Sequence, residues 1–142
     1  MISTRIPFPL TSGVRIKNYF LAKALKEKGY TVDLLLVGFE KRSNLDPNGE
    51  LESVFENIIE FNISRAKAAF NISLGLFSRL PLQCCIFQSY AAEIWLEKNY
   101  GKYFFCHFML LRTYSLWDVV PYDRRIVDLA DILSSTFYQL SK

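Results

Sequence analysis

The amino-acid sequence predicts an α/β fold: a Rossmann-like, open and mainly parallel sheet with helices on both faces. Three observations predict this class. Of the 142 residues, 51% are hydrophobic, which is enough apolar material for the core of one domain. Strand-like apolar runs alternate with helical segments along the chain. Residues 31–37 are apolar except for a few positions such as Asp33, as in a strand that helices cover on both faces.

The first half of the chain predicts two strand-to-helix units. Residues 1–6 are the end of a short strand, and two prolines keep residues 7–13 from becoming helical. A helix over residues 14–28 follows, because two apolar stripes recur at helical spacing and Gly29 supplies a stop. The stripes are Val14, Leu21 and Leu25, and Ile16, Phe20 and Ala24. After the strand at 31–37, we expect a polar surface loop (39–50), a short helix (51–57) and a strand (58–63).

The second half predicts further helices and strands. Ser64 is a plausible N-cap for a helix that runs to about Leu80, where Pro81 ends it. We expect an extended segment at 82–88, a helix from the Ser89 cap to Tyr100 with Gly101 as its stop, a strand at 103–109, a helix at 110–117 and a strand at 125–129. Leu133, Phe137 and Leu140, at spacings of four and three, mark a last helix.

Composition narrows the function classes. The longest apolar stretch, residues 103–111, is far shorter than the roughly 18 to 20 residues that span a bilayer, and we expect no secretion signal. The three cysteines are an odd number in apolar surroundings, which favours a reduced, cytoplasmic chain. The net charge of +3 leaves contact with an anionic membrane surface open, but it does not indicate a nucleic-acid partner.

The sequence lacks the motifs of several enzyme classes. It has neither a dinucleotide-binding glycine fingerprint nor a P-loop. Cys106 and His107 are neighbours in an expected strand, so their side chains should point to opposite faces and cannot form a catalytic pair. His107 also lacks companion ligands at metal spacing, and we expect no metal site.

The most informative segment is Arg5–Asn18, with the sequence RIPFPLTSGVRIKN. A strand end, a proline-stiffened loop and a glycine before a helix would place backbone N–H groups at the carboxyl edge of a sheet, where open α/β folds bind ligands. The alternative is that Pro7–Gly13 is only a tight turn before the helix.

This segment, followed by the run KGYTVDLLL from Lys28, resembles the start of glycosyltransferases of the GT-B fold, family 4 type. In that family a Pro-x-Pro-x-x-Ser-Gly loop precedes a helix with Arg and Asn, and a Gly-His-x-Val motif leads into the second strand; here Tyr30 replaces the His. A second match lies at Arg112, in LLRTY, and at residues 126–135, IVDLADILSS, which are similar to the Arg segment and the Asp-x-x-Asp-x-x-Ser segment of the family.

The resemblance implies substrate-binding residues, each with an alternative. These residues are Ser12, Gly13, Arg15, Asn18 and Arg112. Gly13 would let the loop backbone approach a diphosphate or acceptor, or it is a simple turn residue. Arg15 would pair with phosphate, or it lies on a solvated helix face. Asn18 would bind ligand or satisfy a neighbouring loop backbone, and Arg112 would face the ligand or form a surface ion pair.

The second match also contains aspartates, and their roles have alternatives too. Asp131, just before the expected last helix, fits an N-cap better than a base. Catalytic residues are not assigned.

The resemblance also implies an organisation. Residues 1–142 would form a single Rossmann-like, acceptor-side N-terminal domain, truncated at both ends, whose missing partner is the C-terminal donor-binding domain. The complete enzyme would transfer a hexose, with retention, from a nucleotide-sugar donor to a lipid-linked or polysaccharide acceptor, and we expect no other cofactor. The domain alone should be inactive. The competing hypothesis is a non-catalytic, flavodoxin-like interaction module.

Overall fold

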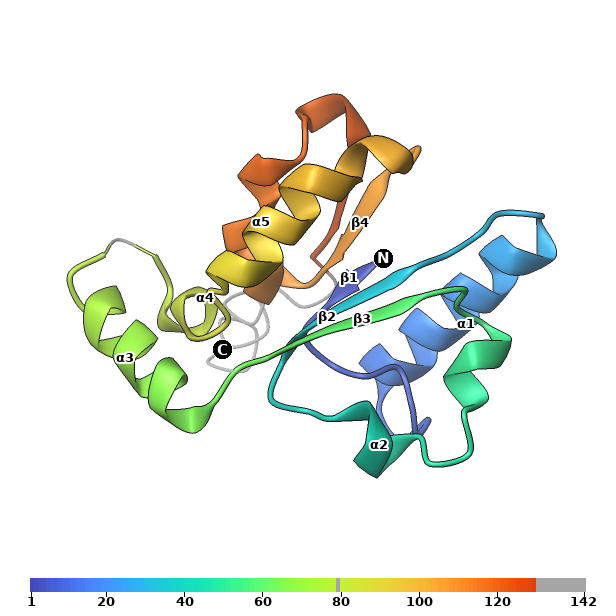
Figure 1. Cartoon of the computed structure of the whole chain (residues 1–142), viewed down its shortest axis with the longest axis horizontal. Coiled ribbons are helices and arrows are strands. Elements are labelled where there is room, and N and C mark those ends of the chain that lie inside the picture. The colour runs from blue at the N-terminus through green and yellow to red at the C-terminus, as the bar shows by residue number, and fades with distance from the viewer. Residues whose placement is uncertain (79, 130–142) are drawn as a thin grey trace, which may run out of the picture.

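The computed structural model describes residues 1–78 and 80–129 and shows a parallel sheet with helices on both faces (Figure 1). Within these residues the strands are β1 (Ile2–Ser3), β2 (Leu34–Gly38), β3 (Ile58–Asn62), β4 (Cys106–Met109) and β5 (Arg125–Asp128). The α-helices are α1 (Gly13–Glu27), α2 (Arg42–Leu45), α3 (Arg65–Gly75), α4 (Leu82–Ile86) and α5 (Tyr90–Asn99). The 3-10 helices are η1 (Glu50–Ser53), η2 (Tyr100–Lys102), η3 (Leu111–Val119) and η4 (Tyr122–Arg124). The predicted Rossmann-like α/β class is therefore confirmed.

The sheet has the strand order β3-β2-β1-β4-β5, and every pair in it is parallel. This is the order of the first five strands of the six-stranded Rossmann fold and differs from the flavodoxin-like order. The chain builds β1, β2 and β3 in one direction and then returns to place β4 on the other side of β1. The carboxyl ends of β1 and β4 are therefore the point at which the winding reverses, where such sheets leave a crevice for ligands.

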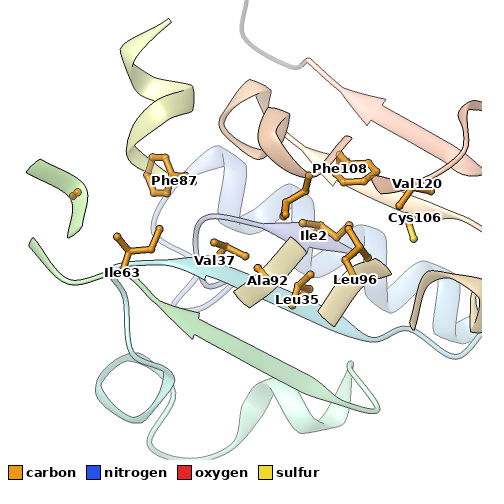
Figure 2. Packing of buried hydrophobic residues seen from close by; sticks show 12 residues of the cluster. Ile2, Leu35, Val37, Ile63, Phe87, Ala92, Leu96, Cys106, Phe108 and Val120 are labelled. Carbon is orange, nitrogen blue, oxygen red and sulfur yellow. The ribbon is translucent and has the colours of Figure 1, made fainter. Parts of the chain in front are cut away.

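Alternating side chains of the central strands fill two separate cores. Leu35 and Val37 of β2 point to one face, and Leu34 and Leu36 point to the other. The first core lies under α4, α5 and η3 and includes Ile2 and Phe108 (Figure 2). The second lies under α1 and η1. Burying both faces of β2 explains why its sequence is apolar without alternation.

Helix ends follow the expected signals in most places. The hydroxyls of Ser64 and Ser89 accept hydrogen bonds from the backbone N–H groups of Lys67 and Ala92, as N-caps do. Gly29, with φ of 86°, ends α1 as predicted. Gly101 does not play that part, because α5 continues into η2 and no left-handed residue is needed.

Two predictions about residues 64–88 were wrong. The third helix ends at Gly75 instead of continuing to about Leu80, and residues 82–88, expected to be extended, contain α4. Pro81 precedes that helix, a position where its fixed φ and missing N–H are tolerated. Packing also favours the helix: a Cβ atom at Gly75 would lie 2.8 Å from Cβ and Sγ of Cys85, so α3 and α4 approach as closely as a glycine allows.

The predicted apolar stripes of α1 need correction as well. The buried residues of α1 are Asn18 and Ala22, whereas Ile16 and Phe20 are exposed. Val14, Leu21 and Leu25 are half-buried. The sheet under the first half of α1 presents Ser3, so a polar side chain faces it. The last predicted helix, with Asp131, Leu133, Phe137 and Leu140, lies outside the described residues.

Candidate functional site

A pocket of about 450 Å³ lies at the carboxyl edge of the sheet, where the winding reverses. Its lining residues are Thr4, Arg5, Phe39, Glu40, Phe87 and Arg112. We call it the carboxyl-edge pocket. Residues that line it follow β1, β2 and β4 directly, so the fold itself gathers them. The volume is within the range of small-molecule sites.

Beside this pocket, the chain just after β1 runs in close contact with the end of β2. A Cβ atom at Gly38, the last residue of β2, would lie 2.7 Å from the carbonyl oxygen of Thr4. Only a glycine lets the backbone beyond β1 run this close to β2. The Thr4 hydroxyl is buried and has no hydrogen-bond partner among the described residues, although buried hydroxyls normally have one. It is thus a polar group at the pocket whose hydrogen-bonding capacity is unused.

The pocket carries two arginines. Arg112 follows β4 and places its guanidinium carbon 5.7 Å from the centre of the Phe87 ring, a cation–π contact. Phe39 packs edge-on against that ring at 5.6 Å between ring centres. Burial, with a smaller contribution from the positive charge of Arg5, lowers the pKa of Arg112. In the described part of the chain, neither guanidinium forms an ion pair with a carboxylate.

Glu40 is the acidic residue among those lining the pocket, and it is already engaged. Its Oε1 pairs with Nη2 of Arg15 at 2.6 Å, and its Oε2 accepts a hydrogen bond of 2.8 Å from the backbone N–H of Ile6. The charge of Glu40 is therefore balanced by Arg15, which leaves the pocket with the two positive charges of Arg5 and Arg112. Such a site favours an anion with several acceptor oxygens, such as a phosphate or diphosphate.

Of the five residues expected to bind substrate, Arg112 lines the pocket. Within the described residues its guanidinium forms no ion pair with a carboxylate, so the alternative of a surface ion pair gains no support there. Arg15 lies behind the pocket: besides Glu40, its guanidinium donates to the carbonyl oxygen of Phe8 at 2.9 Å. With 13% of its side chain exposed, it is not on a solvated helix face.

Asn18 is fully buried and donates to the hydroxyl of Ser3 at 3.4 Å. That hydroxyl in turn donates to the carbonyl oxygen of Arg5 at 2.8 Å and accepts from its N–H. Asn18 therefore supports the turn that presents Arg5, and it does so through the Ser3 side chain; a direct bond to the loop backbone was the alternative to ligand contact.

Ser12 and Gly13 lie at the start of α1. Ser12 is the N-cap residue, but its side chain makes no cap hydrogen bond, and its buried hydroxyl has no partner among the described residues. Gly13 is the first helical residue and does not have a positive φ. A Cβ atom there would have no atom within 4 Å, so the backbone faces open space. Contact of either residue with a ligand stays a prediction.

Cys106 and His107 point to opposite faces of β4, as predicted. Cys106 is part of the first core, whereas Nε2 of His107 lies 3.9 Å from Oδ2 of Asp128 on the other side. Asp128 also pairs with Nζ of Lys17 at 2.5 Å. Burial raises the pKa of the Cys106 thiol, which disfavours a thiolate nucleophile.

Sequence reasoning missed five lining residues: Thr4, Arg5, Phe39, Glu40 and Phe87. A usable signal existed for the first four, because residues directly after parallel strands share one edge of the sheet. Phe87 could not be found in this way, since its segment was expected to be extended. The chain matches no family model, no curated protein and no solved structure.

Proposed function

We propose that this chain is the acceptor-side domain of a retaining, nucleotide-sugar-dependent glycosyltransferase. The complete enzyme would transfer a hexose to a lipid-linked or polysaccharide acceptor. The proposal joins the resemblance of Arg5–Asn18 and Arg112 to family 4 enzymes with the position of the carboxyl-edge pocket. In this proposal the chain binds the acceptor, and turnover also requires a donor-binding domain.

The observation that carries the proposal is the pair Arg5 and Arg112, two positive charges without a carboxylate partner in the described residues, around one pocket. A lipid-linked acceptor carries its sugar on a phosphate or diphosphate. Two guanidinium groups and the Thr4 hydroxyl can donate hydrogen bonds to such a group, and Phe39 and Phe87 supply an apolar wall beside it.

Chemistry at the sugar itself would need groups beyond this pocket. Glu40 is held by Arg15 and the N–H of Ile6, so both of its oxygens already accept hydrogen bonds. We therefore assign it the role of fixing the loop between β1 and α1 and not that of a base. Glu40 lines the pocket and pairs with Arg15, so it connects the pocket to the segment that resembles family 4 enzymes.

The experiment is calorimetric titration of the chain with a short prenyl diphosphate and with the prenyl alcohol of the same length. We expect the diphosphate to bind at least about tenfold more tightly, since the arginines act on its charge. A transfer assay with a panel of nucleotide sugars should then show no turnover by the chain alone.

Two results would contradict the proposal. Equal affinity for the alcohol and the diphosphate would remove the acceptor-phosphate role. Sugar transfer above a no-enzyme control would show that the chain does not need a donor-binding domain. A folded chain that binds neither compound would instead favour the hypothesis of a non-catalytic interaction module.

A further inference from the structure

Helix α3 turns small and polar residues toward the protein and exposes large apolar ones, which is the opposite of what a helix packed on a core usually does. Its buried residues are small or polar: Ala68, Asn71 and Gly75. Two of its large apolar residues, Phe70 and Leu74, are 62% and 55% exposed, whereas Ile72 is half-buried. A helix in water normally turns such side chains toward the protein.

The inward face of α3 is fixed by specific contacts. The Asn71 amide donates to the carbonyl oxygens of Ile86 and Gln88 at 3.3 and 3.1 Å, and Gly75 lies directly against Cys85. Neither contact could be made by a large apolar side chain. The orientation of α3 is therefore built into its sequence, and Phe70 and Leu74 are directed outward by the same contacts.

Neighbouring residues enlarge the exposed apolar area. Leu76 and Phe77 follow α3 and are 68% and 94% exposed, and Leu82, at the start of α4, is 44% exposed. We define the α3–α4 surface as Phe70, Leu74, Leu76, Phe77 and Leu82. In Figure 1, α3 lies at the end of the molecule farthest from α1, away from the sheet.

Basic residues predominate around this surface, and Glu93 is a carboxylate that lies near one of them, Lys67. Residues 61–92 contain Arg65, Lys67 and Arg79 but no Asp or Glu. Arg65 and Lys67 are exposed in the first turn of α3. Basic residues beside exposed Phe and Leu on a helix are the pattern of segments that lie in the interface of an anionic bilayer.

We propose that the α3–α4 surface docks on an anionic lipid bilayer. Phe70, Leu74 and Phe77 enter the boundary between headgroups and acyl chains, and Arg65 and Lys67 remain at the level of the lipid phosphates. The excess of basic residues favours this partner over a second copy of the chain, because two such surfaces would face each other with net like charge. Helix α4 runs from Leu82 in this surface to the residue before Phe87 in the carboxyl-edge pocket, so the pocket would open near the bilayer.

The test is flotation of the full chain with phosphatidylcholine vesicles, with and without about one third phosphatidylglycerol. No sugar acceptor is present, so the result does not depend on the proposed function. We expect the chain to bind the anionic vesicles at least about tenfold more strongly than the neutral ones.

The key variant replaces the apolar residues: Phe70→Ser, Leu74→Ser and Phe77→Ser together. Because these side chains are exposed, circular dichroism should show an unchanged fold, and vesicle binding should fall at least about tenfold. A matched control replaces Phe104 and Tyr122, which are 80% and 86% exposed elsewhere, by Ser. Its binding should stay within about twofold of the starting chain. A second variant, Arg65→Gln with Lys67→Gln, should remove the preference for anionic vesicles.

The proposal is overturned if the chain does not bind anionic vesicles, or if the triple variant binds them as well as the starting chain does. It is also overturned if sedimentation equilibrium shows a dimer that the triple variant dissociates, while vesicle binding is absent. In that case a second copy covers the surface.

Discussion

Arg15 and Glu40, which are far apart in sequence, form an ion pair of 2.6 Å that fastens the start of α1 to the segment after β2. The same carboxylate accepts the N–H of Ile6, and the same guanidinium donates to the carbonyl oxygen of Phe8. Four points of the polypeptide are thus tied together behind the carboxyl-edge pocket. The family resemblance assigned Arg15 to a ligand phosphate; the structure gives it a protein partner that holds the loop.

Replacing this carboxylate should destabilise the fold. Glu40→Gln removes the charge from a pair whose side chains are 13% and 28% exposed, and we expect a loss of about 1–2 kcal/mol in the free energy of unfolding. Urea denaturation measures it. Glu52→Gln is the control, because Glu52 pairs with Arg42 but its side chain is 67% exposed, and an exposed pair is worth at most about 1 kcal/mol. Equal losses in the two variants would show that Glu40 is no more than a surface charge.

Leu110 has φ of 71° and ψ of 156°, a conformation that is almost restricted to glycine, directly before η3 and Arg112. Strain at this point should reverse the usual ranking of glycine and alanine. We expect Leu110→Gly to be more stable than Leu110→Ala by about 1–2 kcal/mol, since both lose the same packing and only glycine relieves the backbone. Denaturant titration of both variants compares them directly. An alanine variant that is the more stable of the two would mean that no strain is present.

The stability should fall as the pH is lowered through the titration of His107. Burial, opposed by the nearby Asp128 carboxylate, lowers the pKa of His107 below its ordinary value of 6.5. The unfolded chain then binds more protons than the folded chain below about pH 6.5, so acid favours unfolding. His107→Gln should flatten the dependence of unfolding free energy on pH in this range. An unchanged slope would show that His107 titrates equally in both states.

Gly13 allows the turn and the ligand hypotheses to be separated. Because its φ is not positive and a Cβ atom would meet open space, Gly13→Ala should leave the fold intact and raise stability by up to about 1 kcal/mol. If the backbone there approaches the ligand, the same variant should weaken binding of a prenyl diphosphate. Thermal denaturation and calorimetry report the two effects separately. Unchanged affinity in the alanine variant would identify Gly13 as a turn residue only.

Much of this fold could be predicted because its signals are local. Strand β2 is a continuous apolar run, Ser64 and Ser89 cap helices through their own hydroxyls, and Gly29 ends α1 in a left-handed conformation. The errors arose where packing at a distance decides. Helix α4 depends on Gly75 and Asn71 of another helix, and the inward face of α1 is set by Ser3 of β1.

The candidate site was predictable only in part. Arg112 follows a recognisable strand, which placed it at the ligand edge. The pairing of Arg15 with Glu40 joins segments whose distance in space no local pattern encodes, so the role of Arg15 could not be inferred. Phe87 enters the pocket because α4 is helical.

The central claim is that Arg5 and Arg112 make the carboxyl-edge pocket an anion site, and titration with inorganic pyrophosphate tests it most directly. Backbone amide NMR shifts would follow binding to the chain, to Arg5→Gln, to Arg112→Gln and to Arg124→Gln, in which an exposed arginine is replaced as the control. We predict saturable shifts at Thr4 and Phe87, with affinity lowered about tenfold by each pocket variant and unchanged by the control. Pyrophosphate binding that is equally strong in the Arg112→Gln variant, or shifts that avoid these residues, would contradict the account.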